Sequence, residues 1–133
     1  MTAILVDTSA YSSFMKGSEA AVGAIQRADA LVFTSIVLGE LKAGFQRSAR
    51  REENERELEE ILRSRRTRTV QVDEETADRY AVIHAHLRRA GQPVPTNDLW
   101  IAASAMQHGL QVLTADAHFL KIPQILVDFL GKP

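Results

Sequence analysis

Short apolar runs alternate along the chain with longer segments whose apolar residues recur at helical spacing. Runs of this length, ended by polar residues, are typical of strands buried inside a parallel sheet. The runs occupy residues 3–6, 31–34, 69–72, 110–114 and 125–127. Because strands and helices alternate throughout, the sequence predicts an α/β fold in which right-handed crossovers join the strands of a parallel sheet.

The chain has 133 residues, of which 45% are hydrophobic, and this is enough apolar material for one core. We find no internal repeat, linker or low-complexity segment that would divide it. We therefore expect a single domain over residues 1–133, built as a three-layer α/β/α sandwich with a central parallel sheet of four to five strands.

The segments between the apolar runs carry residues that start and stop helices. One helix follows the first run, and a second occupies residues 19–28. Ser35 is placed to cap a third, and the charged segment 47–68 predicts an amphipathic helix with glutamate–arginine pairs at i,i+4 spacing. Asp73 begins a further helix that ends at Gly91. Its expected core positions are Ala77, Tyr80, Ala81, His84 and Leu87.

The segment Pro93–Ala105 places a carboxylate where an apolar helix begins. Its prolines favour an extended approach, Thr96 or Asn97 can cap the helix, and Asp98 then falls in the first turn. A local explanation exists, because the helix dipole and the free backbone N–H groups favour an aspartate at this position. A functional role for Asp98 therefore depends on other acids that reach the same place.

Three further acids occupy the same kind of boundary. Asp7 ends the first apolar run, Asp116 follows the fourth, and Glu40 lies inside the helix after the second. Ligands of open parallel sheets bind at the carboxyl ends of the strands, so acids that are distant in sequence can meet there. Their mutual repulsion favours a bound divalent cation, and oxygen ligands in a chain without cysteine fit Mg²⁺ or Mn²⁺. For Asp7, helix capping is the local alternative.

The overall charge does not identify a partner. The 16 lysine and arginine residues are balanced by 17 aspartate and glutamate residues, which argues against an extended basic clamp for nucleic acid. Basic side chains nevertheless gather at both ends of segment 47–68, where they could contact phosphates. These candidates are Arg47, Arg50, Arg51, Arg65 and Arg66. A solvated amphipathic helix is the alternative explanation for this segment.

The sequence also bears on the compartment. No window reaches the roughly 18 apolar residues of a membrane span, and the first apolar run is too short for a signal peptide. The lack of cysteine agrees with a reducing compartment. We expect a cytoplasmic protein that does not enter a membrane.

Four short motifs follow one another in a specific order and spacing. They are Val-Asp-Thr-Ser at 6–9, Ser-Ile-Val-Leu-Gly-Glu-Leu at 35–41, Asn-Asp-Leu-Trp-Ile-Ala-Ala at 97–103 and Leu-Thr-Ala-Asp-Ala-His-Phe at 113–119. Taken together, they make the chain resemble the PIN-domain family and, within it, the small toxin ribonucleases of the VapC type. The resemblance covers nearly the whole chain.

The resemblance implies a site of four acids that binds Mg²⁺ or Mn²⁺ and hydrolyses RNA phosphodiester bonds. Its catalytic residues would be Asp7, Glu40, Asp98 and Asp116, with Asp7, Asp98 and Asp116 as metal ligands. It also implies Thr8 and Thr114 as supporting hydroxyls, Asn97 as a polar neighbour, and a sheet of order 3-2-1-4-5.

The resemblance further implies partners. Toxins of this type are paired with a small antitoxin protein and form homodimers, and their substrate is RNA, which the arginines named above could contact. A candidate surface for either protein partner is the apolar face of Val37, Leu41, Phe45, Leu58 and Leu62. Packing in the core is the alternative explanation for that face.

Three other functions remain open from the residues alone. A phosphoryl-transfer or receiver-like domain could use Asp7, although the Asp-x-Asp element or paired acid and lysine of such proteins are lacking. A metal-independent ribonuclease could use His118 with His84 or His108 as acid and base. A binding module could retain the fold without the chemistry.

Overall fold

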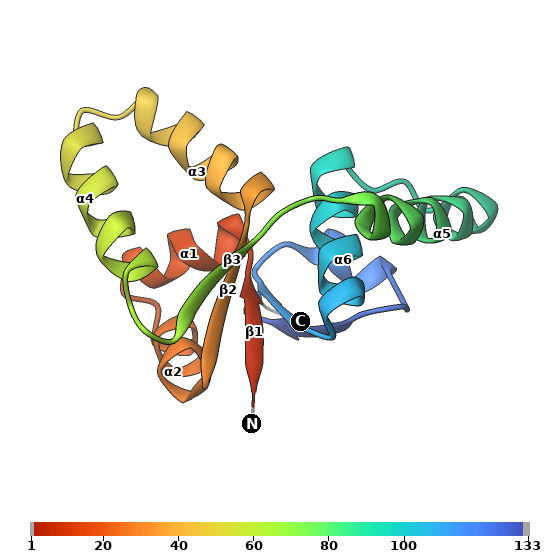
Figure 1. Ribbon diagram of the computed structural model, residues 1–133, viewed down its shortest axis with the longest axis horizontal. Helices are drawn as coiled ribbons and strands as arrows, with labels where there is room; N and C mark the ends of the chain where they lie inside the picture. The colour runs from red at the N-terminus through yellow and green to blue at the C-terminus, as the bar shows by residue number, and fades with distance from the viewer. Residues whose placement is uncertain (1, 132–133) are drawn as a thin grey trace.

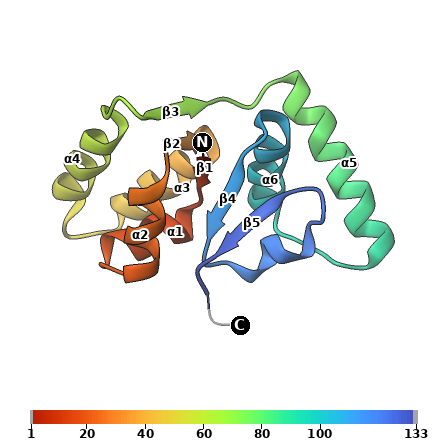
Figure 2. The same ribbon diagram turned by 90° about the horizontal axis from the view of Figure 1, so that it is seen from below.

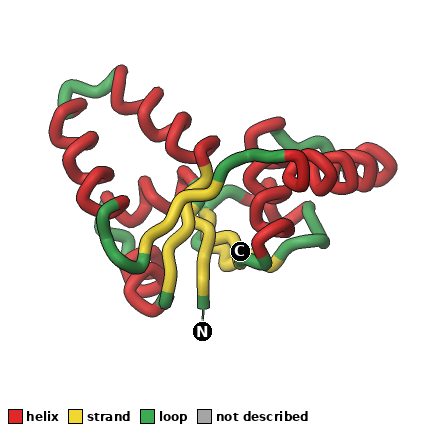
Figure 3. The backbone as a smooth tube through the Cα atoms, viewed as in Figure 1, coloured by secondary structure: helices red, strands yellow, loops and turns green. Residues whose placement is uncertain are grey.

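Five parallel strands form the centre of the protein, for which the computed structural model describes residues 2–131. They lie in the order β3-β2-β1-β4-β5, which confirms the expected sheet (Figure 2). Their bounds are β1 Ala3–Val6, β2 Ala30–Thr34, β3 Thr67–Val70, β4 Gln111–Thr114 and β5 Leu126–Phe129. The tube in Figure 3 shows these strands gathered at the centre, with helices outside them.

Helices cover both faces of this sheet. The helices are α1 Thr8–Met15, α2 Glu19–Arg27, α3 Ser35–Gln46, α4 Arg51–Leu62, α5 Glu74–Ala90 and α6 Thr96–His108, with a 3₁₀ turn, η1, at Ala117–Lys121. The helices α1 to α4 lie to one side of the strands, and α5 and α6 lie to the other (Figure 1). None of the helices in the described part of the chain is long and apolar enough to cross a membrane.

The strand order reverses between β1 and β4. The chain first builds outward from β1 to β2 and β3, and α5 and α6 then carry it back to β4 on the other side of β1. The two neighbours run in parallel, with Val6 opposite Leu113. A reversal of this kind leaves a crevice at the carboxyl ends of the two strands, which is where open α/β sheets bind ligands.

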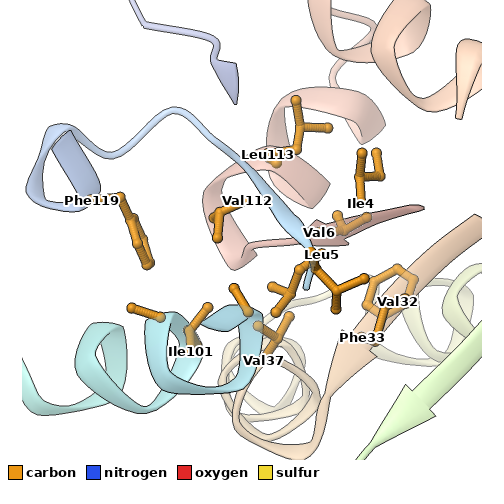
Figure 4. Close-up of a cluster of buried hydrophobic side chains, with 14 of the residues drawn as sticks. Ile4, Leu5, Val6, Val32, Phe33, Val37, Ile101, Val112, Leu113 and Phe119 are labelled. Carbon is orange, nitrogen blue, oxygen red and sulfur yellow. The ribbon is translucent and has the colours of Figure 1, made fainter. Parts of the chain in front are cut away.

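The core explains why the central strands read as continuous apolar runs. Leu5, Val6 and Val32 are fully buried because layers of side chains cover both faces of the sheet. Figure 4 shows these residues together with Ile101 of α6 and Phe119 of η1, which are also fully buried. Tight packing here fixes the ends of β1 and β4, which Asp7 and Asp116 follow in the chain.

Helix starts differ from the sequence expectation at two places. Thr34, not Ser35, caps α3, because its Oγ1 accepts a hydrogen bond from the Val37 backbone N–H at 3.1 Å. Neither Thr96 nor Asn97 caps α6, because the extended chain continues through Pro95 and the helix already begins at Thr96. The start of α5 is confirmed, since Asp73 and Thr76 form a reciprocal capping box.

Three expected segments also differ in extent or orientation. The third strand begins at Thr67, two residues before the expected one, because Thr67 to Val70 pair with β2. The charged segment 47–68 is helical only over Arg51–Leu62, which form α4, because α3 ends before it at Gln46 and β3 begins at Thr67. The buried residues of α5 are Thr76, Ile83 and Leu87, so Ala77, Ala81 and His84 were wrongly assigned to the core and Tyr80 is only partly buried.

Arg66 is a structural anchor between β3 and α2. Its Nη1 donates hydrogen bonds to the carbonyl oxygens of Ile25, at 2.8 Å, and Ala28, at 2.7 Å. These carbonyls lie at the end of α2, where the last backbone acceptors have no partner within the helix. The guanidinium of Arg66 therefore satisfies the end of α2 and is less free for a phosphate than the sequence suggested.

We predict that Arg66→Ala lowers the free energy of unfolding by about 2 kcal/mol, because two carbonyls lose a charged hydrogen-bond donor. Urea unfolding followed by circular dichroism measures this change. The matched control is Arg65→Ala, whose side chain is exposed and whose loss should change the free energy by less than about 0.5 kcal/mol. Equal effects of the two substitutions would contradict the anchoring role.

Candidate active site

The four acids found in the sequence come together above the carboxyl ends of β1 and β4. Asp7 directly follows β1 and Asp116 comes two residues after β4, while Asp98 lies in the first turn of α6 and Glu40 in α3. Asp98 is close enough to the other three for their charges to shift its pKa. The fold therefore gathers residues that are separated by up to 109 positions in the chain.

Two hydroxyl groups hold Asp7. Ser9 Oγ and Thr114 Oγ1 each donate a hydrogen bond of 2.7 Å to Asp7 Oδ2. The same hydroxyl oxygens accept bonds of 2.9 Å from the backbone N–H groups of Ala115 and Asp116, respectively. Asp7 sits at the N-cap position of α1, but its side chain makes no cap hydrogen bond. The Asp7 carboxylate therefore links the end of β1 to the end of β4 and does not cap α1.

Glu40 is oriented by two donors from other elements. Thr8 Oγ1 donates to Glu40 Oε1 at 2.6 Å, and Asn97 Nδ2 donates to Glu40 Oε2 at 3.2 Å. Each carboxylate oxygen therefore has one protein partner and keeps further acceptor capacity. The family resemblance implied Thr8, Asn97 and Thr114 as supporting residues, and each makes a direct hydrogen bond to one of the four acids.

Asp98, Asp116 and His118 form the tightest group. Among the described residues, this is the set whose potential metal-ligand atoms all lie within 4.8 Å of one another. The Asp116 side chain caps η1 by accepting a bond of 2.9 Å from the His118 backbone N–H. His118 Nδ1 lies 3.0 Å from Asp116 Oδ1 and 3.4 Å from Asp98 Oδ2. Asp7, an expected metal ligand, lies beside this set and not within it.

Burial and like charge make the cluster unfavourable when it is fully ionised. The pKa of Asp98 is raised to about 7, mainly by burial and then by the charges of Asp116 and Asp7, while His118 acts in the opposite direction. Burial also raises the pKa of Asp7, against the hydrogen bonds from Ser9 and Thr114. A divalent cation would remove this conflict, and a donor set made mainly of carboxylates fits such an ion.

Two residues of this site were not identified in the sequence as its members. Ser9 was visible only as the second hydroxyl residue after Asp7, a pattern that also suits a helix start. His118 was considered as an acid or base paired with His84 or His108. However, His84 stacks on Tyr80 in α5, and His108 lies at the end of α6 roughly 15 Å from the first turn. These positions do not favour the histidine pair of the alternative mechanism.

The five arginines flank α4 in the chain: Arg47 and Arg50 lie between α3 and α4, Arg51 is the first residue of α4, and Arg65 and Arg66 precede β3. Arg50 is paired with Glu53, at 2.6 Å, and lies 3.8 Å from Glu57. Arg66 is bound to backbone carbonyls, as described above. The remaining side chains, Arg47, Arg51 and Arg65, are exposed.

The apolar face considered as a partner surface belongs mostly to the core. Val37, Leu41 and Leu58 are buried, with exposed fractions of 0%, 4% and 1%. Phe45 and Leu62 are partly buried and pack against that core. Packing inside the protein therefore accounts for most of this face.

Comparisons with known proteins show which proteins this chain is similar to. The model of the PIN domain family matches residues 4–125. Ribonuclease VapC4 of Mycobacterium tuberculosis is 34% identical over 92 residues, which cover 69% of this chain and 71% of that protein.

Two solved structures are similar over nearly the whole chain. DNA-bound VapBC from Salmonella typhimurium has a TM-score of 0.83 and 27% identity, covering 96% of this chain and 98% of that one. VapBC-5 from Mycobacterium tuberculosis, a member of the VapBC family of toxin-antitoxin systems, has a TM-score of 0.76 and 29% identity, covering 99% and 100% of the two chains.

We predict that Asp98→Asn stabilises the protein in metal-free buffer above pH 7. In the native protein the pKa of Asp98 is about 7, against 3.8 for the ordinary carboxyl group, so folding takes up a proton between these values. The contribution of Asp98 to the free energy of unfolding is therefore largest below about pH 4, falls as the pH rises through this window, and levels off above it. The loss that the substitution removes is on the order of 2 kcal/mol.

Thermal unfolding in EDTA at a series of pH values measures this effect. The control is Asp78→Asn, which changes an exposed carboxylate on α5. The unfolding temperatures of native protein and Asp98→Asn should converge near pH 4 and separate towards pH 8. If Asp98→Asn is the less stable protein at pH 8, the carboxylate acts as a helix cap and the repulsion argument is wrong.

Proposed function

The chain belongs to the PIN-domain family and to its VapC-type ribonucleases, and from this we propose that it is a metal-dependent endoribonuclease that hydrolyses RNA phosphodiester bonds. The observation that carries this proposal is the convergence of four acids at the reversal in strand order, two of them buried. We also propose that residues 1–133 fold as one PIN-like domain that acts on RNA in the cytoplasm.

We assign the cation to the space between Asp98 and Asp116, with Asp7 as a further carboxylate beside it. When bound, Mg²⁺ or Mn²⁺ would neutralise these carboxylates, activate water for attack and offset the negative charge of the phosphodiester. The mutual repulsion of the acids in the absence of a cation supports this assignment.

The protein side chains then position the reaction. The Glu40 carboxylate, held by Thr8 and Asn97, is suited to orient a water molecule and accept its proton. The water oxygen bonds to phosphorus as the bond from phosphorus to O3′ breaks. The products are an RNA end with a 5′ phosphate and one with a 3′ hydroxyl, the latter formed when the leaving oxygen takes a proton from solvent. The hydroxyls of Ser9 and Thr114 fix Asp7 in place throughout.

We propose that the protein is the toxin of a toxin–antitoxin pair, that a small antitoxin protein is its partner, and that it forms a homodimer. The similar VapBC-5 is a member of the VapBC family of toxin-antitoxin systems, which supports an antitoxin partner. For the RNA, the exposed side chains of Arg47, Arg51 and Arg65 are the better phosphate contacts. Arg50 and Arg66 are weaker candidates because each already has a protein partner.

We predict that Asp98→Asn reduces RNA cleavage by about a hundredfold or more, because a charge at the cation site is lost while the fold is retained. Cleavage of total bacterial RNA in Mg²⁺ or Mn²⁺ measures the effect, with Asp78→Asn as the control. EDTA should abolish cleavage by the native protein. Cleavage that persists in EDTA would instead favour a histidine mechanism.

The same variant tests the toxin role in cells. Controlled expression of the native protein should arrest growth and produce new RNA ends with 5′ phosphates, whereas Asp98→Asn should do neither. Mapping these ends identifies the RNA target. Growth arrest by Asp98→Asn at equal protein levels would contradict toxicity through RNA cleavage.

We predict that Thr8→Val lowers the rate of RNA cleavage by about tenfold, because Glu40 loses the 2.6 Å hydrogen bond that fixes one of its oxygens. Thr8→Ser, which keeps the hydroxyl, should retain most of the activity. Rates measured at saturating cation separate this positioning effect from weakened metal binding. Equal rates for the two variants would show that the Thr8 hydroxyl does not position Glu40.

A further inference from the structure

His118 directs a shielded ring nitrogen towards the carboxylates of the proposed cation site. The Nδ1 atom is buried, although 43% of the side chain is exposed, so the exposed part of the ring is not the part that faces the acids. The orientation is built in locally, because Asp116 Oδ1 also accepts a hydrogen bond from the His118 backbone N–H. The η1 turn that contains His118 therefore fixes the position of the imidazole beside the carboxylates.

The contacts of Nδ1 are close without being hydrogen bonds. It lies 3.0 Å from Asp116 Oδ1 and 3.4 Å from Asp98 Oδ2, yet it has no hydrogen-bond partner among residues 2–131. Hydrogen bonding requires the N–H to point at the acceptor, and here it does not. Adjacent ligands of one cation show such separations, since two bonds of about 2.1 Å at right angles place their donor atoms about 3.0 Å apart.

We infer that His118 Nδ1 is a direct nitrogen ligand of the cation, beside Asp98 and Asp116, and that the site is a mixed nitrogen and oxygen site. This inference rests on the proposed function and adds a ligand that the four acids do not include. The other charged groups that face the site are Asp7 and Glu40, which supply only oxygen. The remaining ring nitrogen is left to bond with water or another acceptor, as is usual for metal-bound histidine.

A nitrogen ligand changes which ion the site prefers. Mg²⁺ favours oxygen donors and binds imidazole weakly, whereas transition ions accept imidazole readily. The site should therefore favour Mn²⁺ over Mg²⁺ by more than a cluster of carboxylates alone would. His118 is the residue that determines this preference.

Metal affinity measured by titration calorimetry with MnCl₂ and MgCl₂ tests the inference. We expect His118→Ala to weaken Mn²⁺ binding by about tenfold or more and Mg²⁺ binding by less than about threefold, which removes most of the selectivity. His118→Gln, closer in size, should behave like His118→Ala. The control is His108→Ala, an exposed histidine at the far end of α6, which should leave both affinities unchanged.

A second measurement does not depend on any variant folding correctly. Electron spin-echo envelope modulation of Mn²⁺ bound to the native protein should show coupling to an imidazole nitrogen. The coupling should vanish in His118→Gln and persist in His108→Ala. A native complex without nitrogen coupling would overturn the inference, as would His118 variants that weaken Mn²⁺ and Mg²⁺ binding by the same factor.

Asp98→Asn separates this inference from the proposed function. If Asp98→Asn loses metal affinity and RNA cleavage while the His118 variants keep the native selectivity, the nuclease proposal stands and the histidine ligand is wrong. If Asp98→Asn retains both native metal affinity and native cleavage, the proposed site itself is wrong. Selectivity lost in the His118 variants and binding lost in Asp98→Asn would support both.

Discussion

The structure depends on placing carboxylates that repel one another at the junction of β1 and β4. Asp7 and Asp98 are only 3% and 8% exposed, and burial raises the pKa of each. An isolated domain would gain stability by replacing such groups with apolar side chains. The arrangement is explained if these carboxylates bind a cation. The positive charge of the cation would offset their mutual repulsion, and their oxygens would become its ligands.

The surrounding fold limits the cost of this arrangement. Fully buried residues of β1, β2 and β4 form a rigid sheet, and the hydroxyls of Ser9 and Thr114 link Asp7, which follows β1, to the end of the neighbouring β4. Backbone N–H groups hold both hydroxyls in turn, so the orientation of Asp7 follows from the geometry of the strands. Glu40 is held differently, by side chains from α1 and α6, which makes its position sensitive to the packing of those helices.

Several elements supply the charged groups around the site. Asp7 and Asp116 follow β1 and β4, while Asp98 lies in α6 and Glu40 in α3. Beside these carboxylates, His118 supplies a donor that differs in kind from its neighbours, so the identity of the bound ion can depend on one side chain.

The sequence alone determined the alternation of strands and helices, because strands buried on both faces require continuous apolar runs. It also determined that Asp7, Asp98 and Asp116 lie at strand ends and helix starts and that Glu40 lies inside a helix, while the strand order came from family resemblance. Only the tertiary structure decided the partners of each side chain: Ser9 and Thr114 on Asp7, His118 beside Asp98, and Arg66 on the end of α2. The physical reason is that periodicity records which residues are buried, whereas hydrogen bonds and ligand geometry depend on the relative orientation of distant segments.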